Sequence, residues 1–193
     1  MKQFDKESVG FLKAEGLLKS RLVFDGEILQ LYVHDMKLPQ GLVVERELIH
    51  HHPGVGILAI TQENKVVLVK QYRPAVDQFV IEIPAGMLDK GDAQQAILGA
   101  KRELEEETAY QGSHWQELTR FYVSPGFLNE EIILYAATQL EKVENPLPQD
   151  EDEAIELLEL TVEEAEKLLK NGEIKDAKTI IALQYWLGGL LNE

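Results

Sequence analysis

Four glutamates fall within the seven residues "RELEEET", residues 102–108. Like charges three or four positions apart on a helix destabilise it by about 0.2–0.5 kcal/mol per pair. A segment this acidic therefore either faces water or surrounds a cation. Carboxylate oxygens are the ligands that Mg²⁺ and Mn²⁺ prefer in proteins, so the placement of the side chains decides which chemistry is open to the segment.

Helical geometry divides the four glutamates between two faces. An α-helix turns by about 100° per residue, which places Glu105 on roughly the opposite side from the other three, toward solvent. Glu103, Glu106 and Glu107 share one face, with Glu107 inside the apolar stripe of the helix and Glu103 at its edge. The stripe consists of Ala96, Ile97, Ala100 and Leu104.

A run of acidic residues on a helix is usually a solvated face, but such a face points away from the apolar stripe. Ionised carboxylates along the stripe are costly to bury unless cations compensate them, and Arg102 can compensate for one. The chain lacks the D-x-D-x-D-G loop typical of Ca²⁺ sites. We therefore predict that this face binds Mg²⁺, with Mn²⁺ as the alternative.

The surrounding elements that must position this helix read as a mixed sheet flanked by helices. Residues 20–50 contain apolar runs separated by the turn signals "DG" and "LPQG", which favour a small antiparallel sheet. A capping box at Thr161 and Glu164 and a cap at Asp176 predict two C-terminal helices. Further strands are expected at residues 55–61, 65–72, 79–84, 117–123, 131–138 and 154–160, and the acidic helix at residues 95–110.

Bulk composition restricts the function classes. The 193 residues are 45% hydrophobic, which fits one globular domain with a small appendage. With 19 Lys plus Arg against 34 Asp plus Glu, the net charge of −15 argues against nucleic-acid binding. The absence of cysteine excludes disulfides, zinc–thiolate sites and thiol nucleophiles. Neither an apolar membrane span nor the apolar core of a signal peptide is visible, so we expect a soluble cytoplasmic protein.

The segment "IHHHPG", residues 49–54, is a second group of metal-binding residue types. Successive side chains on a strand point to opposite faces, so three adjacent histidines cannot all face one ion. The acidic helix already supplies oxygen ligands. We therefore do not expect a zinc site at these histidines.

The acidic helix resembles part of a known motif, the Nudix hydrolase box G-x5-E-x7-R-E-U-x-E-E-x-G-U, where U is a bulky apolar residue. Residues 86–110 read "GMLDKGDAQQAILGAKRELEEETAY" and match its R-E-U-x-E-E part. Three departures stand out: Asp92 replaces the first Glu, nine residues rather than seven separate it from Arg102, and Ala109 replaces the final Gly. A left-handed backbone at Ala109 would cost about 1 kcal/mol.

Other segments resemble the ADP-ribose pyrophosphatase subgroup of that family. Pro125 lies sixteen residues after Ala109, and "QYRP", "IEIPAG" and "GEIKDAKTIIALQYWL" occur in the expected order. The resemblance implies a mixed α/β (α+β) fold, an α/β/α sandwich with a mixed sheet. It also implies a dimerising N-terminal antiparallel β subdomain at residues 1–50, a hydrolase domain at residues 51–193, and a homodimer.

The resemblance further implies metal-dependent hydrolysis of the pyrophosphate bond of ADP-ribose to AMP and ribose 5-phosphate. The metal ligands would be the backbone carbonyl of Ala85 and the side chains of Glu103, Glu106 and Glu107. The general base would come from an acidic loop before the last strand, where Glu151 and Glu153 are the candidates. An ordinary solvated turn is the alternative for that loop.

Three further residues are expected to contact the substrate. Arg73 of "QYRP" can bind a phosphate with two donors, with a surface arginine as the alternative. Glu82 of "IEIPAG" matches a position that contacts substrate in the family that this chain resembles. A structural salt bridge is the alternative for Glu82. Arg46 would reach the substrate from the N-terminal subdomain.

Three rival functions remain open from the sequence. The first is a Nudix hydrolase acting on another nucleoside diphosphate sugar, and the second is a non-catalytic sensor that binds ADP-ribose. The third is a purely structural acidic domain, which the glutamates in the apolar stripe oppose. Intact box carboxylates and the absence of a basic DNA-binding extension favour the enzyme over the sensor.

Overall fold

The computed structural model describes residues 9–88, 95–149 and 154–191, which form two compact units. One unit contains residues up to His52 together with Tyr122–Glu131. The other contains Pro53–Phe121 and the chain from Ile132 onward. The segment Tyr122–Glu131 therefore groups with the N-terminal strands although residues 53–121 of the other unit lie between them in the sequence. Each unit is described below by itself.

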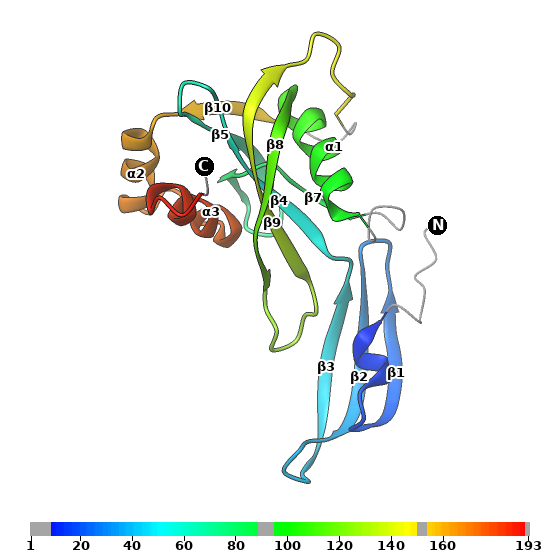
Figure 1. Ribbon diagram of the computed structural model, residues 1–193. Helices are drawn as coiled ribbons and strands as arrows, with labels where there is room; N and C mark the ends of the chain where they lie inside the picture. Colours follow the sequence, from blue (N-terminus) through cyan, green and yellow to red (C-terminus); the bar gives the residue numbers. More distant parts are fainter. Residues whose placement is uncertain (1–8, 89–94, 150–153, 192–193) are drawn as a thin grey trace. The chain divides into compact units, whose positions relative to one another are not determined.

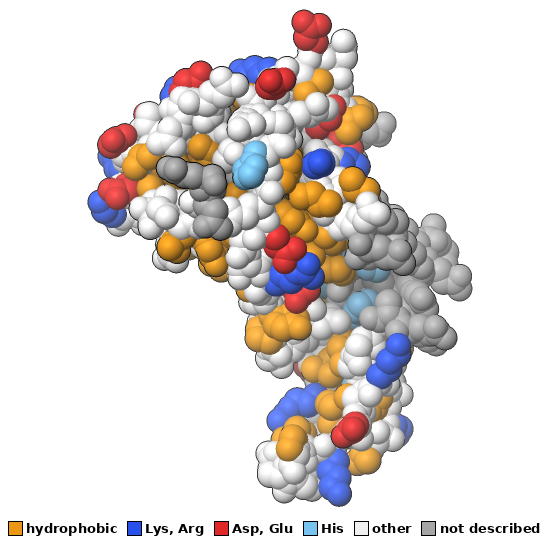
Figure 2. Space-filling view, viewed as in Figure 1, with side chains coloured by type: hydrophobic (Ala, Val, Ile, Leu, Met, Phe, Trp, Pro, Cys, Tyr) orange, Lys and Arg blue, Asp and Glu red, His pale blue; other side chains and the backbone are white. Residues whose placement is uncertain are grey.

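The first unit is built on an antiparallel three-stranded sheet in the order β1-β2-β3 (Figure 1). Its strands are β1 (Leu17–Asp25), β2 (Leu29–Lys37) and β3 (Val43–His51), preceded by a short 3-10 helix, η2 (Gly10–Lys13). The turns fall at the predicted "DG" and "LPQG" segments, and Gly41 has the positive φ of 90° that favours glycine. Almost all of β1 is exposed, and Figure 2 shows apolar side chains at the surface of this part of the chain.

Histidines and an asparagine hold the segment Tyr122–Glu131 against β3. Asn129 Oδ1 accepts a hydrogen bond from the backbone N–H of His51 at 3.0 Å and lies 3.3 Å from Nδ1 of His50. Nδ1 of His51 also lies 3.3 Å from a carboxylate oxygen of Glu130. This hydrogen bond to Glu130 raises the pKa of His51, although burial opposes it. The histidines of "IHHHPG" thus anchor a loop.

The second unit contains a seven-stranded mixed sheet whose main path runs β10-β5-β4-β9-β8. Strands β4 and β9 are parallel, whereas β5 runs antiparallel to both β4 and β10. Strand β6 pairs antiparallel with β5, and β7 pairs antiparallel with β4. The strands are β4 (Gly54–Ile60), β5 (Val66–Arg73), β6 (Gln78–Glu82), β7 (Ala85–Met87), β8 (Tyr110–Tyr122), β9 (Glu131–Lys142) and β10 (Glu156–Leu160).

Helices cover both faces of this sheet, α1 (Ala96–Thr108) on one side and α2 (Val162–Lys170) and α3 (Ala177–Leu187) on the other (Figure 1). Strand β4 is buried throughout because its alternate side chains enter two cores. Ile57 packs in the core beneath α1, whereas Leu58 packs in the core shared with α2 and α3. The predicted α/β/α sandwich with an added antiparallel sheet is confirmed.

Local signals set the ends of the helices. The predicted capping box is present, with the Thr161 side chain accepting from the Glu164 backbone and Glu164 accepting from the Thr161 backbone. Asp176 caps α3 as predicted. Ala109 ends α1 with φ 56° and ψ 25°, so the backbone is left-handed at the position where the motif has glycine.

No helix within the described residues has the length and apolar character that crossing a membrane requires.

Candidate active site

Glu107 is the most deeply placed carboxylate of the acidic helix. Glu107 is only 3% exposed, and its Oε2 accepts a hydrogen bond of 3.1 Å from the backbone N–H of Ala85. Ala100 and Leu104 on the same helix are fully buried against the sheet. Because Glu107 shares their face of α1, this packing also places its side chain on the buried side of the helix. The helical arithmetic that placed Glu107 inside the apolar stripe is therefore correct.

Glu103 and Glu106 lie on the same face and are joined through Arg102. Nη2 of Arg102 is 2.7 Å from Oε1 of Glu103, and Nη1 is 2.6 Å from Oε2 of Glu106. The Glu103 carboxylate packs so closely on Gly86 that a Cβ at this glycine would collide with it. A glycine here thus lets a carboxylate approach the backbone beside Ala85.

Glu105 points away from the other three, as predicted, and has a structural task. Its Oε2 accepts a hydrogen bond of 2.7 Å from the side chain of Gln111, and its Oε1 accepts one of 3.2 Å from the backbone N–H of Leu147. It therefore ties the segment after β9 to α1. Glu151 and Glu153, the candidate general bases, follow that segment and lie outside the described residues.

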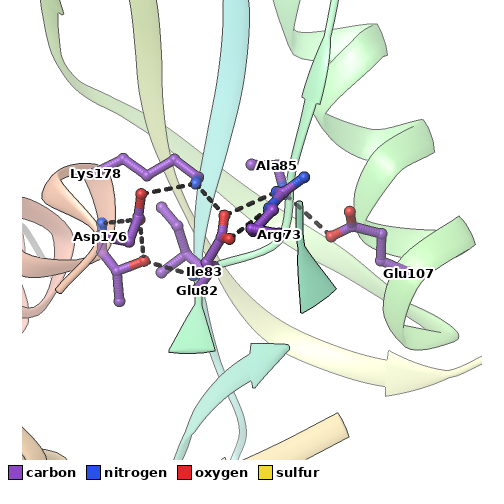
Figure 3. A network of polar contacts seen from close by, with 8 residues as sticks. Arg73, Glu82, Ile83, Ala85, Glu107, Asp176 and Lys178 are labelled. Carbon is purple, nitrogen blue, oxygen red and sulfur yellow. Dashed lines mark hydrogen bonds and ion pairs between the residues drawn. The ribbon is translucent and has the colours of Figure 1, made fainter. Parts of the chain in front are cut away.

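Arg73 and Glu82 form a bidentate ion pair across the β5–β6 hairpin (Figure 3). Nε and Nη2 of Arg73 donate to the two Glu82 oxygens at 2.6 and 2.9 Å. Nζ of Lys178, at the start of α3, donates to Oε2 of the same carboxylate and lies 3.1 Å from Oδ1 of Asp176. We call Arg73, Glu82, Asp176 and Lys178 the Glu82 ion cluster.

Electrostatics within this cluster keep Glu82 ionised. Burial would raise the pKa of Glu82, but the hydrogen bond from Arg73 and the charge of Lys178 outweigh burial and hold that pKa below its usual value. The hydrogen bond with Glu82 likewise raises the pKa of Arg73. The Arg73 side chain remains 42% exposed, so part of this firmly held side chain is accessible from solvent.

A second set of hydrogen bonds connects the start of α3 to the segment between β6 and β7, which precedes Ala85. Asp176 Oδ2 accepts from the hydroxyl of Thr179 at 2.6 Å, and that hydroxyl oxygen accepts from the backbone N–H of Ile83 at 2.8 Å. Ile83 is two residues from Ala85, whose N–H is bound by Glu107. Figure 3 shows these contacts linking α3 to Ile83, and Ala85 to α1.

The structure thus brings most of the predicted site residues into one unit. Ala85 touches Glu107, and Glu103 lies against the neighbouring Gly86. Arg46 is on the other unit, exposed on β3, where its Nη1 donates to the carbonyl of Glu45 at 3.0 Å.

Sequence reasoning missed Lys178 and Thr179, having assigned only the cap at Asp176. The segment "DAKT" carried the available signal. It places two further polar side chains within one helical turn of an N-terminal cap.

The residue types at α1 fit a divalent cation. Three carboxylates and one backbone carbonyl are the hard oxygen donors that Mg²⁺ and Mn²⁺ take. Within residues 9–88, 95–149 and 154–191, however, no three acidic or histidine side chains converge on one point. Because Arg102 pairs with Glu103 and Glu106, a cation would compete with this guanidinium for the same oxygens.

Comparisons with known proteins show which family this chain belongs to. The family model described as the NUDIX domain matches residues 50–183. The chain is 44% identical over 177 residues to a methanol dehydrogenase activator from Bacillus methanolicus, covering 92% of this chain and 95% of the relative. It is 41% identical over 171 residues to an ADP-ribose pyrophosphatase from Bacillus subtilis (strain 168), covering 89% and 91%.

A solved structure described as an ADP compounds hydrolase has the same fold. Its TM-score against this chain is 0.75, with 90% of this chain and 94% of the other covered at 20% sequence identity. Together with the family match and the placement of the box carboxylates on α1, these relatives identify the chain as a member of the Nudix hydrolase family.

Proposed function

We propose that this enzyme hydrolyses the pyrophosphate bond of ADP-ribose to AMP and ribose 5-phosphate. The observation that carries the proposal is the buried Glu107 carboxylate, bonded to the Ala85 N–H and accompanied on its helix face by Glu103 and Glu106. A structural acidic domain has no use for carboxylates placed along its core. The similarity to an ADP-ribose pyrophosphatase supports this choice of substrate.

Mg²⁺, or alternatively Mn²⁺, would be held by the Ala85 carbonyl and by Glu103, Glu106 and Glu107. When bound, the cation neutralises charge on the diphosphate and acidifies water. Glu106 would act in catalysis through its place in this ligand set.

Hydrolysis itself needs a water molecule and a base. The water oxygen forms a bond to one phosphorus, the bridging P–O bond breaks, and the departing phosphate keeps the electron pair of that bond. Glu151 or Glu153 would take the proton from the attacking water. No covalent enzyme intermediate is required.

The remaining site residues would hold the substrate. Arg73 would bind a phosphate through the side of its guanidinium that faces away from Glu82. Glu82 would fix Arg73 and contact the substrate. Arg46 would contribute from the N-terminal subdomain of a homodimer.

The assembly proposed is a homodimer formed through residues 1–50, with residues 51–193 as the hydrolase domain. Large exposed apolar side chains on the first unit support an interface there (Figure 2). They include Leu18, Phe24, Ile28, Leu42 and Val43. The net charge of −15 supports a small-molecule substrate over nucleic acid, and we assign the enzyme to the cytoplasm.

The substrate is tested by incubating the purified enzyme and Mg²⁺ separately with ADP-ribose, ADP-glucose, diadenosine polyphosphate and GDP-mannose, and resolving the products by chromatography. AMP should form fastest from ADP-ribose. Glu107→Gln should slow the reaction at least about a hundredfold, the scale on which loss of one electrostatic group acts. Glu166→Gln, on an exposed glutamate of α2 paired with Lys170, is the matched control and should retain activity.

The other outcomes are equally informative. Binding of ADP-ribose without cleavage would replace the enzyme with a sensor. Faster cleavage of another substrate would retain the reaction type and reject ADP-ribose. Full activity of Glu107→Gln would reject the metal-binding role of α1.

A second candidate role follows from the 44% identical relative, which is named for activation of methanol dehydrogenase. It is tested by adding the purified protein, or its Glu107→Gln variant, to a methanol dehydrogenase and measuring the rate of methanol oxidation. Acceleration by the active protein but not by the variant would tie activation to hydrolysis. The absence of any acceleration would reject this role.

A further inference from the structure

Lys178 occupies an unusual position for a lysine. Its side chain is only 15% exposed, and its ammonium contacts two carboxylates, Glu82 and Asp176. Lysine carries a strongly hydrated charge and is rarely buried unless that charge is paired. A pairing with Asp176 alone would meet this requirement near the surface. The additional contact with the buried Glu82 connects α3 to the β5–β6 hairpin.

Both cations bind the Glu82 carboxylate. Nε of Arg73 donates to Oε1, whereas Nη2 of Arg73 and Nζ of Lys178 both donate to Oε2. Lys178 thus holds the carboxylate from α3, in addition to the two bonds from Arg73 on β5. A bidentate pair fixes the plane of the guanidinium only while the carboxylate itself is fixed. Lys178 therefore determines how well the orientation of Arg73 is defined.

The charges of the Glu82 ion cluster balance, with Arg73 and Lys178 positive and Glu82 and Asp176 negative. Without Lys178 the remaining three residues would carry a net negative charge, which would oppose the approach of an anion to Arg73. Lys178 therefore lets Arg73 meet a ligand from a neutral cluster rather than from an anionic one.

We propose that Lys178 is a positioning residue for the substrate diphosphate, acting through Glu82 on Arg73. This inference rests on the proposed function in that Arg73 must bind a phosphate of the substrate. Lys178 itself touches no reacting atom. It keeps the guanidinium preorganised, and preorganisation improves affinity by removing the cost of ordering the side chain on binding.

Lys178→Met should raise KM for ADP-ribose about tenfold while kcat stays within about twofold, because a ground-state contact is loosened and the reacting groups are untouched. Lys178→Arg should recover most of the lost affinity, since it retains a positive charge beside Glu82. Lys170→Met, which removes an exposed lysine paired with Glu166 on α2, is the matched control and should leave both constants unchanged.

The route through Glu82 is tested in a second background. In Glu82→Gln enzyme the carboxylate clamp is gone, so adding Lys178→Met should change KM by less than about twofold. An equal tenfold increase in both backgrounds would overturn the inference, because Lys178 would then act independently of Glu82. An unchanged KM together with a lower thermal midpoint would also overturn it, leaving a purely structural ion pair.

A second Lys178 variant and a binding measurement complete the test. Lys178→Gln, which retains a hydrogen-bond donor toward Glu82 but no charge, replaces Lys178→Met if that variant does not fold, and the same increase in KM is expected. Titration with inorganic pyrophosphate by calorimetry separates this inference from the substrate assignment. Wild-type protein that fails to cleave ADP-ribose refutes the proposed function alone, whereas unchanged pyrophosphate affinity in the Lys178 variant refutes the positioning role.

Discussion

Replacing Ala109 with glycine should stabilise the unit that contains α1. Ala109 has φ 56° and ψ 25° at the end of the helix, in the left-handed region where a Cβ is crowded. Its N–H donates to the carbonyl of Glu105 at 2.8 Å, and its carbonyl accepts from the N–H of Val143 at 2.9 Å. Both bonds use backbone atoms only, so the substitution retains them.

The magnitude follows from two opposing effects. The left-handed conformation costs a non-glycine residue about 1–2 kcal/mol. Glycine removes that cost. It also increases the conformational entropy of the unfolded chain, which lowers the free energy of unfolding by about 0.4–1 kcal/mol. The net gain in the free energy of unfolding is therefore about 0.5–1 kcal/mol. For a chain of this size that corresponds to a rise in thermal midpoint of about 1–4 °C.

Urea unfolding followed by tryptophan fluorescence measures this gain in the appropriate unit, because both tryptophans, Trp115 and Trp186, lie in the second unit. Ala100→Gly is the matched control. It places the same substitution inside α1 at a fully buried residue, where it should destabilise by about 1 kcal/mol or more. A loss of stability in Ala109→Gly would refute the assignment of backbone strain to this position.

Two further predictions concern pH. Because the folded-state pKa of Glu82 lies below its ordinary value of 4.5, the stabilisation from its ionised form is present above that value and is lost as pH falls through the folded pKa. Wild-type protein should thus lose, below pH 4.5, its stability advantage over Glu82→Gln in urea unfolding, and a constant difference would contradict this. The pKa of His51 is raised, so its effect on stability depends on pH in the opposite direction. The stabilisation from protonated His51 is complete below pH 6.5, its ordinary pKa, and is lost as pH rises through the folded-state pKa. NMR titration should show the His51 pKa falling in Glu130→Gln, and an unmoved pKa would exclude Glu130 as the cause.

Local rules predicted the features that depend on neighbours in sequence. Helical periodicity placed Glu107 in the core and Glu105 outside it, because both positions follow from the repeat of one helix. The capping box at Thr161 and the strain at Ala109 were likewise decided within a few residues. In the same way, the continuous apolar run of β4 indicated a buried strand, which the two cores on its faces explain.

Contacts between distant segments could not be predicted from one sequence. Lys178 and Glu82 are 96 positions apart, and their pairing depends on how α3 packs against the sheet. The same limitation hid the hydrogen bond from Leu147 to Glu105. It also concealed the association of residues 122–131 with β3, which combines hydrogen bonds of the Asn129 side chain with backbone hydrogen bonds to Ile49.

The hydrogen bond from Ile83 to Thr179 has a consequence for the order of events during synthesis. The ribosome makes the glutamates of α1 and the segment from Glu82 to Ala85 well before α3. A nascent chain that still lacks α3 holds the carboxylates but neither the Lys178 ion pair nor the Thr179 acceptor for Ile83. The segment from Glu82 to Ala85 therefore reaches its final conformation only after α3 has emerged, and turnover should be delayed until that point of translation.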